Sequence, residues 1–150
     1  MANSKALSAI TWAGMLSGTL DITAAVVVYV HFGMHPIPLL QGIAKGLIGP
    51  RACQGGWPTA LLGLALHFVI AFGAATAYFL ASRKLCFLMK HGFACGVLYG
   101  IAVYFFMRRI VIPLSLAPLY PFSWEMMGIG VLIHIVCVGL PIAGMVRWQG

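Results

Sequence analysis

Four ionisable side chains lie singly within long apolar stretches of this chain: Asp21, His67, Arg108 and His134. Carboxylate and imidazole groups can bind or relay protons and ions, and a charged group inside a membrane indicates a functional site by default. An isolated Asp or Arg near the bilayer centre costs at least about 2.5 to 3.5 kcal/mol. We therefore expect these four side chains to meet at one depth of a polar intramembrane site, with Asp21 paired with Arg108.

Composition identifies the class of protein that holds these groups. Of the 150 residues, 62% are hydrophobic and 7% are charged, which is too apolar for a soluble globular domain. The net charge of +7 comes from scattered basic residues and two acids, without the basic stripe that binds nucleic acid. We expect an integral membrane protein surrounded by lipid, with no nucleic-acid partner.

Four apolar stretches are long enough to span a bilayer, for which a helix needs about 20 residues. They lack the alternation of barrel strands, so each is expected to be a helix. The first is longer than the apolar core of a signal peptide, and we expect it to be retained. The chain is thus predicted to be one all-α domain over residues 1–150, a bundle of four transmembrane helices at about residues 6–29, 58–81, 93–112 and 126–146.

The distribution of Lys and Arg predicts the orientation of this bundle. Basic residues collect on the cytoplasmic side of membrane proteins. Placing both termini in the cytoplasm leaves Lys45 and Arg51 outside and puts five basic residues inside, namely Lys5, Arg83, Lys84, Lys90 and Arg147. The sequence therefore favours a topology with both the N-terminus and the C-terminus inside.

The first outer connection, residues 33–57, is unusually apolar for a loop. Leu40, Ile43 and Leu47 recur near helical spacing, whereas Gln41 and Lys45 fall elsewhere. This pattern predicts a short amphipathic helix at the membrane surface, or a re-entrant segment.

Small residues recur at four-residue spacing in the first and third predicted helices. In membranes such spacing lets helix backbones approach closely, and it also suits association with a second copy or another membrane protein. We expect helix packing, and a homo-oligomer or a membrane-protein partner, to involve Gly14, Gly18, Gly92, Gly96 and Gly100.

The four cysteines contain no CxxC pair and fall at different predicted depths, so neither a disulfide framework nor a thiolate metal site is expected. No cofactor is predicted as the first choice. Haem b is the alternative, with His67 and His134 as iron ligands from facing helices.

Residues 40–50, followed by Gly55, Gly56 and the apolar stretch 59–72, resemble an uncharacterised group of small four-helix bacterial inner-membrane proteins. The resemblance implies a multi-pass protein of the bacterial cytoplasmic membrane and no particular activity.

Three functions fit these features. The first is a small channel or proton-coupled transporter that uses Asp21 and the two histidines to bind or relay an ion while Arg108 tunes their charge. The second is a haem-binding electron carrier. The third is a non-catalytic scaffold or accessory subunit that holds partners through its glycine-rich faces. The first is our prediction, and enzymatic activity is not expected.

Overall fold

The computed structural model describes residues 2–119 and 121–149 of the chain, with side chains described from Lys5 onward. The protein is 90% helical, and the part that the structure describes contains no strand. Four helical segments are long and apolar enough to cross a membrane: Lys5–His31, Gly56–Lys84, Gly92–Leu114 and Trp124–Gln149. Each contains one of the predicted spans and extends it by a few residues, which confirms the all-α fold with four candidate spans.

The first two spans are unbroken helices, and the last two each contain a π-helical turn. The first is α1 (Ala2–His31) and the second is α3 (Gly56–Lys84). The third consists of α5 (Gly92–Phe106), the π-helical segment η2 (Met107–Val111) and α6 (Ile112–Leu114). The fourth consists of α7 (Trp124–Ile133), the π-helical segment η3 (His134–Gly139) and α8 (Leu140–Gln149).

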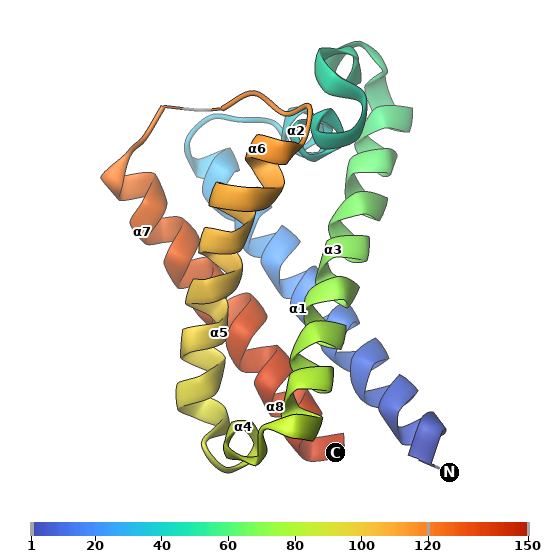
Figure 1. Ribbon diagram of the computed structural model, residues 1–150. Helices are drawn as coiled ribbons and strands as arrows, with labels where there is room; N and C mark the ends of the chain where they lie inside the picture. The colour runs from blue at the N-terminus through green and yellow to red at the C-terminus, as the bar shows by residue number, and fades with distance from the viewer. Residues whose placement is uncertain (1, 120, 150) are drawn as a thin grey trace.

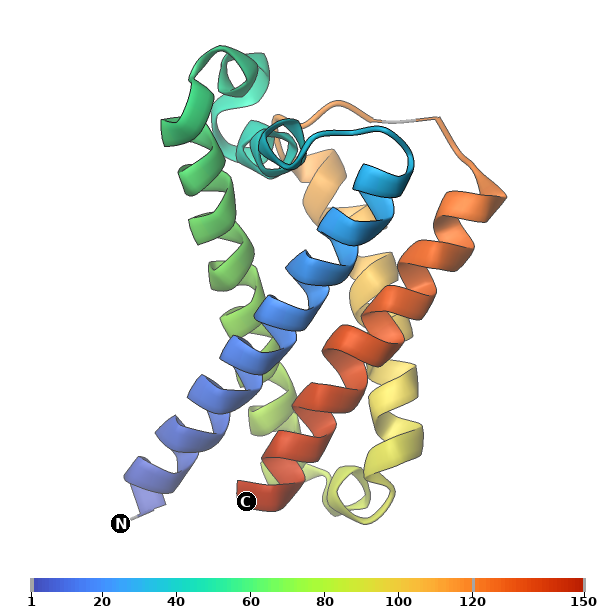
Figure 2. The ribbon, with the colours of Figure 1, turned by 180° about the vertical axis from the view of Figure 1, so that it is seen from behind.

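Successive spans run in opposite directions and form a bundle with two different ends (Figure 1). Both termini and the short helix α4 (Cys86–Lys90) lie at one end, here called the termini end. The other end, called the α2 end, carries α2 (Pro36–Ile48) and the 3-10 helix η1 (Gly49–Gln54). Seen from behind, the fourth span lies between α1 and α5 (Figure 2).

The buried side chains gather in the half of the bundle nearest the termini. Small residues of α1 and α8 pack there around the ring of Tyr78, which is 2% exposed. By contrast, neither α7 nor η2 contains a buried residue. The main core therefore lies at the termini end, and the buried residues at the α2 end are those where α2 and η1 pack on α3. The tightly packed cluster consists of Ala9, Ala13, Ala75, Tyr78, Phe79, Val138, Ile142, Ala143 and Val146.

The predicted helix in the first outer connection is present as α2, seen nearly end-on in both ribbon views and thus lying across the long helices. Its buried face carries Gln41 and Ala44, while Leu47 is 55% exposed. The Gln41 amide donates hydrogen bonds to Gly56 O (3.1 Å) and Thr59 Oγ1 (3.2 Å). The polar side chain is thus turned toward α3 and an apolar one outward, as expected beside lipid.

Four of the five predicted glycines, all except Gly92, lie at close contacts between elements. A methyl group at Gly100 would lie 2.5 Å from the His134 carbonyl oxygen, and one at Gly96 would lie 3.0 Å from the Gly139 carbonyl oxygen. A methyl group at Gly14 or Gly18 would meet the rings of the α3 residues Phe72 or Phe68, respectively, whereas Gly92 has room for one at 3.4 Å from Arg147 Cδ. The glycines therefore set the spacing of the third span against the fourth and of α1 against α3.

Alanine at Gly100 should destabilise the bundle, because the methyl group meets backbone atoms that cannot turn aside. Overpacking of this kind costs about 1 to 3 kcal/mol. Gly73 of α3 is the matched control, since a methyl group there meets nothing within 4 Å. Thermal unfolding in detergent should show a lower midpoint for Gly100→Ala and an unchanged or higher one for Gly73→Ala. Equal midpoints would show that the third and fourth spans are not in close contact.

The predicted topology can be tested with two cysteines that the chain already has. Cys53 in η1 and Cys86 in α4 are both exposed and lie at opposite ends of the bundle. Two variants should be prepared, each retaining only one of these cysteines. An impermeant thiol reagent added to intact cells should label the Cys53 variant and should label the Cys86 variant only after lysis. Labelling of Cys86 in intact cells would show that the termini end faces outward, which is the opposite of the predicted topology.

Candidate functional site

Three of the four predicted site residues lie at the same depth. At a rise of about 1.5 Å per residue, Asp21 of α1 is about 15 Å from the α2 end of its helix, and His134 is about 15 Å from that end of its span. His67 of α3 lies about 16 Å from it by the same measure. Arg108 in η2 is only about 9 Å from the end of its span. The predicted common depth therefore fits Asp21, His67 and His134, whereas Arg108 lies about one helical turn nearer the α2 end.

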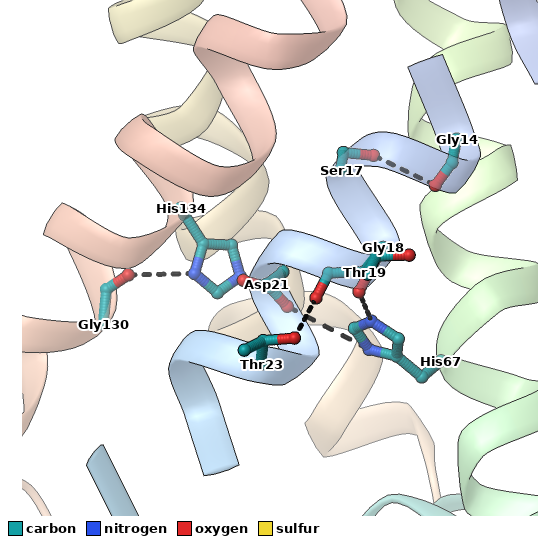
Figure 3. Close-up of polar contacts among 9 residues, drawn as sticks. All are labelled: Gly14, Ser17, Gly18, Thr19, Asp21, Thr23, His67, Gly130 and His134. Atoms are coloured by element: carbon teal, nitrogen blue, oxygen red, sulfur yellow. Dashed lines mark hydrogen bonds and ion pairs between the residues drawn. The ribbon is translucent and has the colours of Figure 1, made fainter. Parts of the chain in front are cut away.

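His67 joins α3 to α1. Its Nε2 atom lies 2.8 Å from the backbone oxygen of Gly18 (Figure 3). The helices approach closely here because Gly18 has no side chain, and a methyl group on it would lie 2.8 Å from the Phe68 ring and 3.1 Å from Ala71 Cβ. A hydrogen bond between helices inside a membrane is worth about 0.6 to 2 kcal/mol. His67 therefore contributes to the packing of α1 on α3.

The same imidazole faces a carboxylate through its other nitrogen. His67 Nδ1 lies 4.0 Å from Asp21 Oδ2, and the two side chains are 13% and 17% exposed. The sequence analysis expected Arg108 as the partner of Asp21, and in the described part of the chain the ion-pair partner found for Asp21 is His67. Asp21 and Gly18 share a face of α1 at three-residue spacing, so one histidine on the neighbouring helix can reach both.

The hydrogen bond to Gly18 determines which nitrogen of His67 carries a hydrogen in the neutral ring. A peptide oxygen only accepts, so His67 Nε2 must carry a hydrogen, which leaves Nδ1 as the nitrogen with a lone pair in the neutral ring. One proton between Nδ1 and Oδ2 gives either imidazolium with carboxylate or neutral imidazole with carboxylic acid. Without that proton, a lone pair on Nδ1 faces a lone pair on Oδ2, which is unfavourable. At 4.0 Å the two atoms are too far apart for a direct hydrogen bond, so a small approach or a bridging water is needed for transfer.

The second oxygen of Asp21 is not satisfied by the chain. Asp21 Oδ1 is buried and has no hydrogen-bond partner within the described residues. A buried polar atom left without a partner costs about 1 to 3 kcal/mol, and more when it is charged. A proton, an ion or a water is the group that would relieve this cost.

His134 lies on the other side of α1 from His67. Its Nδ1 is 2.9 Å from the Gly130 oxygen, and its ring packs edge-to-face on Tyr104 at a centroid distance of 5.4 Å. The η3 segment, which begins with His134, packs against α1. His134 therefore lies on a segment in contact with the helix of Asp21, and its hydrogen bond is to Gly130 of its own span.

The π-helical turns have a cause in the sequence. η2 ends two residues before Pro113, and η3 ends two residues before Pro141. Proline has no backbone N–H and its ring clashes with the carbonyl one turn earlier, and a widened turn relieves that clash. Isolated π turns are frequent at functional sites, and here they contain Arg108 and His134. The proline positions were a signal for these turns that the sequence analysis did not use.

The described residues contain no group of three or more His, Cys, Asp and Glu side chains able to hold a metal ion. For the haem alternative, His67 and His134 each already use one ring nitrogen on a backbone oxygen. Iron ligation would have to use the remaining nitrogens, and a visible absorption spectrum of the purified protein tests it directly.

Comparison with known proteins adds no function. No protein-family model, no curated protein and no solved structure matches this chain. Function is therefore argued from the geometry of the site.

The contact between Asp21 and His67 should appear as an energetic coupling. In a double-mutant cycle with Asp21→Asn and His67→Gln, we expect a coupling of about 0.5 to 3 kcal/mol, as for residues in one polar network. Glutamine keeps a donor for the Gly18 oxygen and loses the second ring nitrogen that faces Asp21. The reference cycle combines Asp21→Asn with Arg108→Gln and should give a smaller coupling by denaturant unfolding in detergent. A larger coupling to Arg108 would restore the pairing expected from the sequence.

Proposed function

We propose that this protein is a small proton-coupled transporter or proton channel, in which the Asp21–His67 pair binds the proton midway through the membrane. The proposal places it in the bacterial cytoplasmic membrane with the termini end on the cytoplasmic side. The four candidate spans support the membrane location, and the excess of Lys and Arg at the termini end supports the orientation.

The observation that carries the proposal is the arrangement of three atoms around one imidazole. Gly18 O fixes the proton on Nε2, and Nδ1 then faces a carboxylate oxygen at 4.0 Å. A pair of this kind holds one proton in either of two positions, on the imidazole or on the carboxylate. If the role of His67 were only to join two helices, the bond to Gly18 would be sufficient, and Asp21 with its unsatisfied oxygen would add only cost.

The packing of the bundle suggests the side from which the proton arrives. Toward the α2 end, α7 and η2 contain no buried residue, whereas the main cluster of buried side chains lies toward the termini end. Toward the termini end, Tyr99 Oη donates to the Ala74 oxygen (2.7 Å) and its ring packs on Tyr78 at a centroid distance of 4.9 Å. This contact joins α5 to α3 between the Asp21–His67 pair and the termini end of the bundle. We infer that the proton enters from the α2 end and that release requires the Tyr78–Tyr99 contact to open.

Neutralising Asp21 should abolish proton movement. In proteoliposomes with an imposed potential and a pH-sensitive dye, Asp21→Asn should reduce flux to the level of empty vesicles, because the amide keeps the shape and cannot bind the proton. Glu125→Gln is the matched control, since Glu125 is the other acid of the chain and lies in the first turn of α7.

Flux of the unaltered protein that is no greater than that of empty vesicles would remove the support for transport. The scaffold function would then become the leading candidate.

A further inference from the structure

A pocket of about 440 Å³ opens at the termini end between the first turns of α1 and the end of α8. It is lined by Lys5, Ser8, Trp148 and Gln149. This pocket is separate from the Asp21 site and has no part in the proposed proton path. We propose that it binds the phosphate headgroup of an anionic phospholipid in the leaflet at the termini end.

The lining residues are suited to an anion. Lys5 provides an ammonium group, Ser8 a hydroxyl, Trp148 an indole N–H and Gln149 an amide NH₂, and all four can donate hydrogen bonds to phosphate oxygens. None of the four side chains carries a negative charge. A phosphodiester, which has one charge and several acceptor oxygens, matches this set better than a cation or an apolar molecule.

The charged side chains around the pocket also favour an anion. The two acids of the chain are Asp21, at mid-depth, and Glu125, at the α2 end. Basic side chains on the elements that reach the termini end include Arg83, Lys90 and Arg147. The field at this end is therefore positive, and basic residues next to a membrane attract anionic lipids with about 1 kcal/mol each.

The position of the pocket favours a lipid over a soluble phosphate. Lys5, Ser8 and Trp12 fall at spacings of three and four residues, so they share one face of α1. Trp12 is 59% exposed and lies one turn deeper in the membrane than Ser8, which provides apolar surface for an acyl chain below the polar pocket. Trp148 is 79% exposed at the rim, and indole rings of this kind sit at the level of lipid headgroups.

The test measures lipid binding to the purified full-length protein in neutral detergent by native mass spectrometry. Phosphatidylglycerol should bind more tightly than phosphatidylcholine with the same chains. Lys5→Gln should weaken phosphatidylglycerol binding about fivefold, the equivalent of about 1 kcal/mol per basic residue. Trp148→Phe should also weaken it, because the ring is kept and the N–H donor is lost. Lys5→Arg, which keeps the positive charge, should bind phosphatidylglycerol as well as the unaltered protein does.

Lys90→Gln is the matched control, with the same charge change at the same end but outside the pocket. It should change binding less than twofold. If Lys5→Gln and Lys90→Gln weakened phosphatidylglycerol binding equally, the lipid would be attracted to the charged surface in general and not to the pocket. This result would overturn the proposal. Equal binding of both lipids would also overturn it. A third arm adds inorganic phosphate as competitor, and displacement of the lipid at millimolar phosphate would assign the pocket to a soluble anion.

Discussion

The imidazole of His67 is the group on which the polar interior of this protein depends. One of its nitrogens holds the Gly18 oxygen at 2.8 Å and the other faces Asp21 at 4.0 Å, so a single ring links two polar atoms of α1 from the neighbouring helix. The link exists only because Gly18 allows the helices to approach. The same backbone contact therefore determines both the α1–α3 spacing and the proton state that the ring can adopt.

This arrangement is poorly suited to stability alone. A hydrogen bond from His67 to a backbone oxygen would hold α1 against α3 without any carboxylate nearby. Asp21 adds an ionisable group with one buried oxygen that the described residues do not satisfy, and groups of this kind inside a membrane are costly. The cost is understandable when the carboxylate exchanges its charge with a proton during function, because the neutral acid has a smaller desolvation penalty.

The sequence predicted the fold better than the site. The spans were predictable because twenty apolar residues in a row have few alternatives to a membrane helix. The depth of Arg108 was harder to predict, because it depends on where the third helix ends, and hydropathy did not show that the helix continues through Pro113 to Leu114. Gln41 appeared to lie on the exposed face of its helix, yet it is buried against α3 because its amide finds Thr59 and Gly56. Partners of this kind depend on tertiary contacts that no local pattern encodes.

The two halves of the bundle differ in how readily they can change shape. α1 and α3 are unbroken, are joined by His67, and carry α2 clamped to α3, where Gly63 meets the Leu40 backbone. The third and fourth spans each contain a π turn before a proline, where backbone hydrogen bonding is already interrupted. Bending is least costly at such points. Under the proposed function, α1 and α3 would hold the proton-binding pair in place while the other two spans bend, and the Tyr99 hydrogen bond to α3 is the contact that this bending must break.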